Sequence, residues 1–160
     1  MSQAAITEAA SAEDYAAGRT LIEEYAAAVA VDLCFQNFSE EMANLPGIYG
    51  PPQGCLLLAR INGEWVGCVA VRKRDAESCE MKRLYVKTQY RGLGLGRRLA
   101  ELAIRCAQKL GYSRIFLDTL PSMAEAQSLY RSLGFREVEA YYPNPVEGVR
   151  YLALALSHGA

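Results

Sequence analysis

The stretch LYVKTQYRGLGLGRRLAELAIRCAQKLGY, residues 84–112, places three glycines at alternate positions directly before an amphipathic helix. The predicted helix ends at Gly111, and its apolar stripe consists of Leu95, Leu99, Leu102, Cys106 and Leu110. Glycines permit positive φ and a close approach of a ligand to the backbone. Amides exposed in this way at the positive end of a helix dipole suit a phosphate or diphosphate. The sequence therefore predicts an anion-binding loop ahead of this helix.

Two arginines, Arg97 and Arg98, open the predicted helix. A cation in the first turn opposes the helix dipole by about 0.3 to 1 kcal/mol unless a bound anion offsets that cost. The alternative is that both are solvated helix formers. The spacing of the glycines favours a bound anion over two merely solvated arginines.

Two other kinds of phosphate-binding loop have patterns that differ from this one. A Walker loop needs GxxxxGK[ST], which the stretch lacks. A dinucleotide fold needs GxGxxG directly after its strand and an acidic residue about 20 positions on. Asp118 has a suitable position, but the glycines read GxGxG and begin six residues after Val86. The spacing argues against a dinucleotide without excluding it.

Composition points to one globular domain covering residues 1–160, because 51% of the residues are apolar and 22% are charged. A net charge of −1 does not favour nucleic acid. The start does not read as a signal peptide and the apolar run YAAAVAV is short, so we expect a cytoplasmic protein without a membrane span. Five scattered cysteines and a single histidine, His158, predict no metal site and leave no histidine for catalysis.

The remaining pattern alternates strands and helices. Strands are predicted at 5–9, 55–61, 64–74, 79–86, 114–120, 136–142 and 149–156, with helices at 11–30, 39–47 and 121–135. Asn62-Gly63 predicts a type I′ hairpin turn, and Ser122 with Glu125 predicts a capping box. The order indicates a mixed α/β fold in one unit.

Arg91, Gly94 and Gly96 form an R-x-x-G-x-G pattern after the strand EMKRLYV, and LYRSLGF follows in a later helix. This combination resembles the acetyl-coenzyme A signature of the GNAT superfamily of N-acetyltransferases. The two motif regions cover residues 79–136, and the resemblance in element order spans nearly the whole chain. It implies a mixed, mostly antiparallel central sheet flanked by helices. It also implies a wedge where the strand Leu84–Val86 splays from the strand RIFLDT.

The resemblance assigns the coenzyme site. It implies that the pantetheine arm pairs with the backbone of Leu84, Tyr85 and Val86, and that the diphosphate rests on amides of Arg91, Gly92, Leu93, Gly94, Leu95, Gly96 and Arg97. Many members have an asparagine seven residues before the helix tyrosine, where this chain has Met123. That contact is therefore missing or made by backbone.

The resemblance also implies two catalytic residues. Tyr130 would protonate the departing thiolate, because a phenol of pKa about 10 can donate to a thiol of pKa about 8.5. The alternative is a core aromatic. Glu80 would accept the amine proton directly or through water. Alternatively, Glu80 is a solvated or ion-paired glutamate of the strand, and an ordered water serves as the base.

We expect acetyl transfer from acetyl-CoA to a primary amine of a small metabolite or amino-acid-like compound, with no metal. Candidates for the acceptor pocket are Tyr25, Phe35, Phe38, Tyr141, Tyr142 and Asn144, with Arg72, Arg74, Lys82 or Arg83 for an acceptor carboxylate. A peptide or protein amine, a non-catalytic acyl-CoA sensor and a nucleotide-binding oxidoreductase stay open as alternatives. So does a homodimer.

Overall fold

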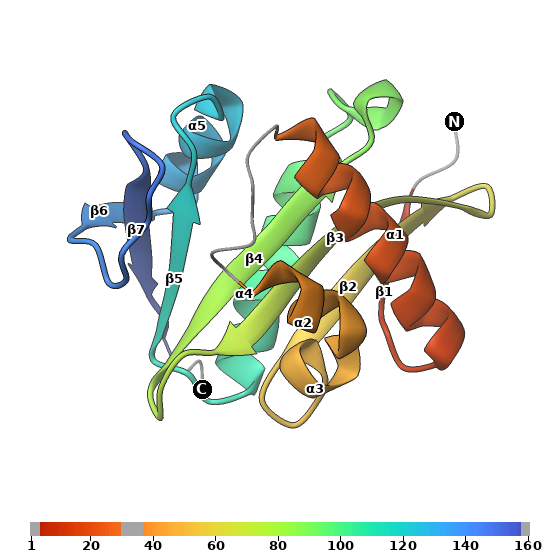
Figure 1. Cartoon of the computed structure of the whole chain (residues 1–160), viewed down its shortest axis with the longest axis horizontal. Coiled ribbons are helices and arrows are strands. Elements are labelled where there is room, and N and C mark those ends of the chain that lie inside the picture. Colours follow the sequence, from red (N-terminus) through yellow and green to blue (C-terminus); the bar gives the residue numbers. More distant parts are fainter. Residues whose placement is uncertain (1–3, 30–36, 158–160) are drawn as a thin grey trace.

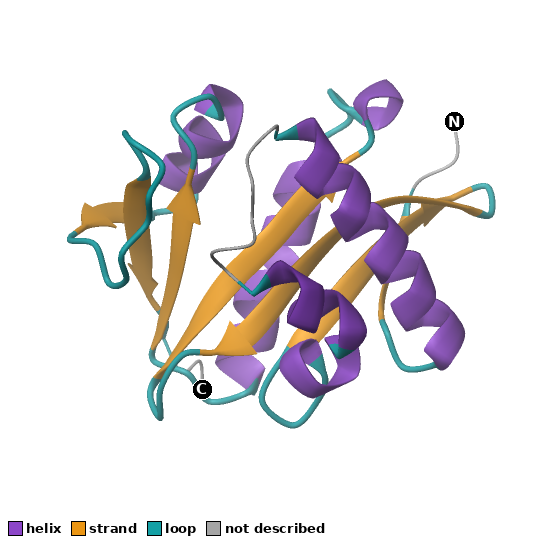
Figure 2. Ribbon diagram, viewed as in Figure 1, coloured by secondary structure: helices purple, strands orange, loops and turns teal. Residues whose placement is uncertain are grey.

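The computed structural model describes residues 4–29 and 37–157, which build a seven-stranded sheet with helices on both faces (Figures 1 and 2). The strand order is β1-β2-β3-β4-β5-β7-β6. The strands are β1 (Ala5–Glu8), β2 (Cys55–Ile61), β3 (Glu64–Lys73), β4 (Ser78–Val86), β5 (Arg114–Thr119), β6 (Arg136–Val138) and β7 (Arg150–Ala155). Neighbouring strands pair antiparallel except β4 and β5, which are parallel. The predicted mixed, mostly antiparallel sheet is confirmed.

Helices cover the two faces of the sheet separately (Figure 1). They are α1 (Ala12–Ala28), α2 (Phe38–Ala43), α3 (Leu45–Tyr49), α4 (Leu95–Lys109) and α5 (Ala124–Ser132), with a short 3-10 turn η2 (Thr88–Tyr90). One core, which includes Leu21 and Tyr49, lies under α1 to α3, and a second, which includes Leu99 and Ile115, lies under α4 and α5. Within residues 4–29 and 37–157, the helices are too short or too polar to cross a bilayer.

Local sequence signals explain several elements. Asn62 and Gly63 have φ of 50° and 81°, as a type I′ turn between β2 and β3 requires. Ser11 caps α1, and the Asp14 carboxylate accepts from the Ser11 amide, so the two form a capping box. The first four predicted strands are all present as β1 to β4.

Three predicted boundaries are wrong. The single helix predicted at 39–47 is two helices, α2 and α3, and Pro46 lies in the first turn of α3, where its missing N–H costs nothing. The Ser122–Glu125 capping box does not form. Instead α5 begins at Ala124, and the side-chain Nε2 of Gln127 donates to the Leu120 carbonyl just before it at 2.8 Å. The strand predicted at 136–142 ends at Val138.

The face that α4 packs on the sheet differs from the predicted leucine stripe. Its buried residues are Leu95, Leu99, Ala100, Ala103 and Ala107, whereas Leu102, Cys106 and Leu110 are only partly buried. Small alanines let the helix axis approach the sheet closely, and a pattern search for large apolar residues overlooks them.

The sheet topology also decides one alternative. A dinucleotide fold is a largely parallel sheet with helices on both faces. In the described chain only β4 and β5 are parallel. The glycine loop therefore does not belong to a dinucleotide fold.

Candidate active site

The parallel strands β4 and β5 separate along their length (Figure 1). They pair only where Ser78–Glu80 faces Arg114–Phe116, and β5 continues to Thr119 with β7 as its partner. Over the described residues, the edge of β4 beyond Glu80 therefore faces β5 without forming a ladder. Such an edge offers backbone donors and acceptors to a ligand strand or chain. The predicted wedge is confirmed.

A bulge in β4 lies beside the opening of the wedge. Arg83 has φ of 63°, and the register of β4 against β3 shifts between Cys68 and Ala70. A bulge of this kind bends the strand and increases its twist. Because the left-handed conformation costs a non-glycine residue about 1–2 kcal/mol, surrounding contacts must hold Arg83 in place.

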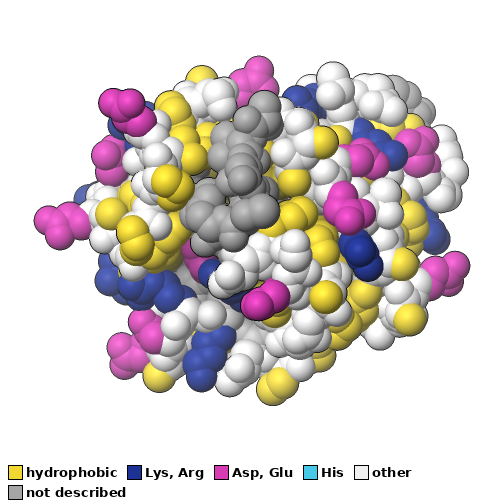
Figure 3. Space-filling view, in the orientation of Figure 1, with side chains coloured by type: hydrophobic (Ala, Val, Ile, Leu, Met, Phe, Trp, Pro, Cys, Tyr) yellow, Lys and Arg dark blue, Asp and Glu magenta, His cyan; other side chains and the backbone are white. Residues whose placement is uncertain are grey.

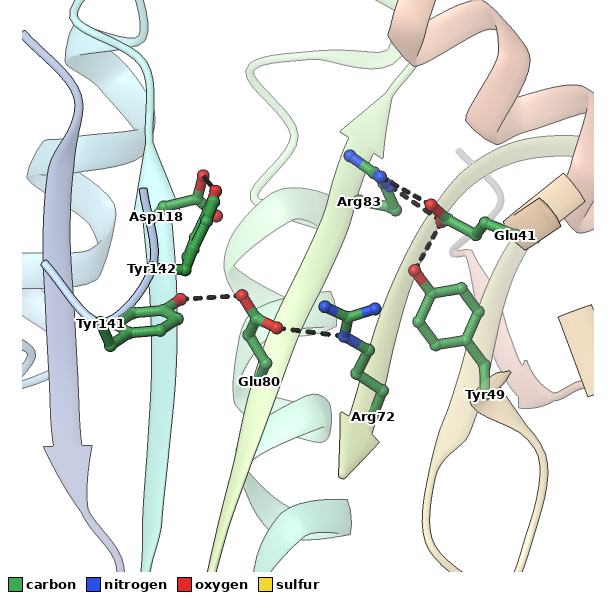
Figure 4. A network of polar contacts seen from close by, with 8 residues as sticks. All are labelled: Glu41, Tyr49, Arg72, Glu80, Arg83, Asp118, Tyr141 and Tyr142. Carbon is green, nitrogen blue, oxygen red and sulfur yellow. Dashed lines mark hydrogen bonds and ion pairs between the residues drawn. The ribbon is translucent and has the colours of Figure 1, made fainter. Parts of the chain in front are cut away.

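Those contacts come from α2 and α3 (Figure 4). The Arg83 guanidinium donates twice to Glu41, with Nη2 to Oε1 at 2.6 Å and Nε to Oε2 at 2.9 Å. The Tyr49 hydroxyl donates to the same carboxylate. Burial alone would raise the pKa of the Glu41 carboxyl, but the hydrogen bonds and charge of Arg83 outweigh it and lower that pKa below its usual range.

The glycine loop lies at the other side of the wedge. Gly92 and Gly94 have φ of 83° and 77°, whereas Gly96 is already in α4. Gly94 is the N-cap of α4 and no side chain caps the helix there. The first amides of a helix have no partner inside the helix. The backbone conformations of Gly92 and Gly94 are therefore those that the predicted anion-binding loop needs.

The loop arginines have protein partners. The Arg91 Nε donates to the Val86 carbonyl at 2.9 Å, which ties the loop to the end of β4. Arg97 donates to the Ser132 hydroxyl at 2.8 Å, and Arg98 to the Ala4 carbonyl at 3.1 Å. These bonds supply a structural reason for both helix-opening arginines, so their presence alone does not require an anion.

A cleft of about 830 Å³ joins the β4 edge to the loop. This volume suits a ligand of coenzyme size. Of the residues predicted for the coenzyme, those that line the cleft are Leu84, Tyr85, Val86, Arg91, Gly92, Gly94, Leu95 and Gly96. Leu93 is 55% exposed and, like Arg97, does not line it. Met123 lines the cleft at the start of α5, so no asparagine side chain is available at that position.

Tyr130 lies in α5 within the core under α4 and α5, and its ring packs edge-on against Phe135 at 5.7 Å between centroids. Burial raises the pKa of the Tyr130 phenol, and Tyr25 and Asp118 add to the rise. The phenol is therefore neutral at physiological pH and keeps a proton to donate. Leu129 lines the cleft, but Tyr130 does not. This placement fits the core-aromatic interpretation, whereas the donor role stays a prediction, because the raised pKa also makes the phenol a weaker acid.

Glu80 is nearly buried on the α1–α3 face of β4 (Figure 4). Its Oε1 accepts from Arg72 Nε at 3.1 Å across the β3–β4 pair. Its Oε2 accepts from the Tyr141 hydroxyl at 2.8 Å. The interpretation as a solvated strand glutamate is therefore wrong, because only 4% of the side chain is exposed. Glu80 instead forms an ion pair with Arg72, as the other alternative predicted.

The segment after β6 folds back over the wedge and brings two tyrosines to it. Tyr141 packs on Phe116, and Tyr142 donates to the Asp118 carboxylate of β5. The Tyr151 hydroxyl donates to the Tyr142 carbonyl at 3.0 Å, which holds the segment down. These contacts explain why β6 is shorter than predicted. Burial and the Glu80 carboxylate raise the pKa of the Tyr141 phenol, so it stays a donor.

The other acceptor candidates divide between two places. The side-chain Nδ2 of Asn144 donates a hydrogen bond to the Tyr142 hydroxyl at 3.0 Å, within the wedge. Tyr25 and Phe38 flank the Arg83 guanidinium at 5.9 and 5.5 Å from their ring centroids. Phe35 lies outside the described residues, as do Cys34 and His158.

The candidate cations are already engaged to different degrees. Arg83 is buried in its ion pair with Glu41, which makes it a structural residue. Arg72 pairs with Glu80 and keeps 37% of its side chain exposed, and Arg74 stacks on Phe116 and keeps 30% exposed. Lys82 is buried, and burial lowers the pKa of its ammonium. Arg72 and Arg74 are therefore the accessible cations among the four.

Two residues of the site were missed from the sequence. Asp118 was considered only for a dinucleotide, although its place two residues after Phe116 puts both on one face of β5. Glu41 follows no pattern that would have linked it to Arg83, 42 residues further on. The alternation of residues in β5 could have identified Asp118. No local sequence pattern could have identified Glu41.

Residues 12–135 match the model of the acetyltransferase (GNAT) family. An uncharacterized N-acetyltransferase of Schizosaccharomyces pombe is 45% identical over 141 residues, covering 87% of this chain and 86% of the relative. A GNAT-family acetyltransferase of Staphylococcus aureus Mu50 has a crystal structure with a TM-score of 0.81 at 21% identity, covering 97% and 100% of the two chains.

A third similarity concerns an enzyme named for its product. N-acetylaspartate synthetase of Danio rerio is 36% identical over 100 residues. The match covers 61% of this chain and 36% of that enzyme, so it is confined to a minor part of the larger protein.

Proposed function

Because the chain belongs to the acetyltransferase (GNAT) family, we propose that it transfers the acetyl group of acetyl-CoA to the primary amine of a small, amino-acid-like metabolite. The observation that carries the proposal is the open edge of β4 beside the glycine loop, in one continuous cleft. Attack is direct, within a complex that holds both substrates.

The cleft supports the coenzyme as donor. The β4 edge at Leu84–Val86 lines the cleft, and we expect it to pair with the amide-containing pantetheine arm as an added strand would. The amides after Gly92 and Gly94 are placed for the diphosphate. A backbone N–H of the β4 edge then stabilises the negative charge that develops on the thioester oxygen.

The polar groups of the wedge support the proton transfers. Glu80 takes one proton from the acceptor ammonium, directly or through a water, and the free amine nitrogen attacks the thioester carbon. The C–S bond breaks as the amide forms, and the leaving thiolate receives the proton of Tyr130. The nitrogen loses a second proton to solvent, and the proton held by Glu80 returns to the Tyr130 phenolate through water. One acetamide, one thiol and one net proton are produced, and both residues regain their starting protonation states.

The acceptor class follows from the charges near the wedge. Glu80 and Asp118 attract an ammonium, and the partly exposed Arg72 and Arg74 suit a carboxylate. This combination matches an amino-acid-like acceptor, and the similarity to N-acetylaspartate synthetase supports it. In the view of Figure 3, the acidic and basic side chains of the described residues are interspersed, whereas a basic protein tail would favour a broad acidic surface.

A panel of amines tested for thiol release from acetyl-CoA checks the acceptor. We expect turnover with amino acids or related amines that carry a carboxylate, and loss of turnover when the carboxylate is amidated. Preference for a peptide N-terminus would contradict the small-molecule proposal. Coenzyme binding without thiol release for any amine would favour the non-catalytic sensor.

Gly94→Val is expected to weaken acetyl-CoA binding by roughly 5- to 30-fold, equivalent to about 1–2 kcal/mol. A Cβ at Gly94 meets nothing within 4 Å, so the effect comes from φ of 77° rather than from a clash. Titration calorimetry measures the affinity. Gly111→Val is the matched control, since Gly111 has φ of 93°, equally open space and a place at the other end of α4. Equal affinities for Gly94→Val and wild type would contradict the diphosphate placement.

Glu80→Gln is expected to lower kcat/KM about 100-fold at neutral pH, and by less at high pH, where free amine is abundant and needs no base. The profile of kcat/KM over pH measures this. Asp118→Asn is the comparison, because Asp118 is the second carboxylate of the wedge. A wild-type rate at neutral pH in Glu80→Gln, together with a large loss in Asp118→Asn, would assign the base to Asp118 instead.

A further inference from the structure

Three potential metal ligands meet at the end of the molecule away from the glycine loop. Their ligand atoms, the Sγ of Cys55, the Sγ of Cys106 and a Glu8 carboxylate oxygen, all lie within 4.8 Å of one another. In the described part of the chain, no other His, Cys, Asp and Glu side chains form such a group of three. We propose that these three residues bind a zinc ion.

The site joins three elements that are distant in sequence. Glu8 is the last residue of β1, Cys55 the first of β2, and Cys106 lies in the last turns of α4. Cys106 follows Leu95, the first residue of α4, by eleven positions, which is about 16 Å along a helix. The cluster is therefore separate from the cleft, and the inference does not rest on the proposed acetyl transfer.

The donor set selects the metal. Two thiolates and one carboxylate suit zinc, whereas magnesium and calcium take oxygen ligands only. With Zn–S bonds near 2.3 Å, tetrahedral geometry places two sulfurs about 3.8 Å apart. The ligand atoms reach such a shell by shifts of about 1 Å or less. Water completes the fourth position, as in other sites with three protein ligands.

Solvent access is provided on one side of the cluster. Cys55 is 1% exposed, Cys106 is partly buried and Glu8 is exposed. An ion can enter beside Glu8, and the two thiol protons leave to solvent as the Zn–S bonds form. The bound ion would fix the edge strand β1 to α4, so it would stabilise the fold rather than take part in chemistry.

The sequence predicted no metal site because it lacks CxxC and histidine-rich motifs. Here the ligands are separated by 47 and 51 residues, so only the packing of α4 on β1 and β2 brings them together.

Zinc binding to the reduced, full-length protein tests the proposal by competition against a chelator, with metal content measured by mass spectrometry. We expect one zinc per chain, with a dissociation constant below about 1 μM, and a melting temperature that rises with zinc concentration. Cys106→Ser is expected to weaken binding by at least about 100-fold, since even partners of metal ligands are worth 10- to 100-fold. Exposed Glu8→Gln, which leaves the core intact, should weaken it by about 10-fold.

Cys68→Ser is the matched control, because Cys68 is a buried cysteine of the other core whose sulfur contacts the Arg83 carbonyl. It should bind zinc as wild type does. Cobalt substitution gives a second readout, since cobalt thiolates absorb in the near ultraviolet. Wild-type affinity in both Cys106→Ser and Glu8→Gln would overturn the proposal. So would a Cys55–Cys106 disulfide in protein that binds no zinc when reduced.

Discussion

Tyr130→Phe is expected to lower kcat by roughly 100- to 10,000-fold, the range that a positioned proton donor contributes. The affinity for acetyl-CoA should stay nearly unchanged, because phenylalanine keeps the ring that packs on Phe135. The physical reason is that the buried phenol is neutral and can protonate the leaving thiolate. Steady-state kinetics with the best amine, together with calorimetry of coenzyme binding, separates the two effects.

Tyr112→Phe provides the control for loss of a buried hydroxyl. The Tyr112 hydroxyl donates to the Gln53 carbonyl at 2.6 Å, on a different part of the fold. Its removal should cost about 1 kcal/mol of stability and leave kcat unchanged. A wild-type kcat in Tyr130→Phe would assign Tyr130 to core packing alone, and the leaving thiolate would then need another donor.

Glu41→Gln is expected to lower the free energy of unfolding by about 3–5 kcal/mol, because it leaves the charge of Arg83 buried without its partner. Both side chains are nearly buried, at 3% and 4% exposure. The same change should lower kcat/KM, since the bulge at Arg83 determines the path of Leu84–Val86 along the cleft. Urea denaturation measures the stability, and kinetics measures the consequence for the site.

Glu137→Gln is the matched control, because Glu137 pairs with Arg150 at the surface with 56% of its side chain exposed. It should cost less than about 1 kcal/mol. The two variants also differ in pH dependence. The folded-state pKa of Glu41 is lowered, so its contribution is complete above the unfolded value of about 4.3 and is lost as pH falls through the folded pKa. A Glu41→Gln deficit that stays constant as the pH is lowered through that range would contradict the ion-pair explanation.

Much of the sheet was predictable because its signals are local. Alternation defined β2 and β3, and Asn62-Gly63 defined the turn between them. The glycine loop was located because positive φ at Gly92 and Gly94 leaves a trace in residue type. Helix boundaries were less certain, since Ser122 and Pro46 each allow two local structures that tertiary contacts decide.

The contacts that tune the site were not predictable, because they join residues distant in sequence. Arg83 adopts a conformation that its residue type disfavours, and its ion pair with Glu41, which Tyr49 also holds, comes from two other elements. For Arg97 and Arg98, the sequence suggested a function that protein contacts also explain. Their position suggested a ligand, but α5 and the segment before β1 supply protein partners for both.

A crystal structure with acetyl-CoA bound tests the central proposal most directly. We predict that the diphosphate will lie on the backbone amides between Gly92 and Arg97, that the pantetheine arm will pair with Leu84–Val86, and that the sulfur will lie within hydrogen-bonding distance of the Tyr130 hydroxyl. A diphosphate bound outside the cleft, or a thioester remote from the gap between β4 and β5, would contradict it.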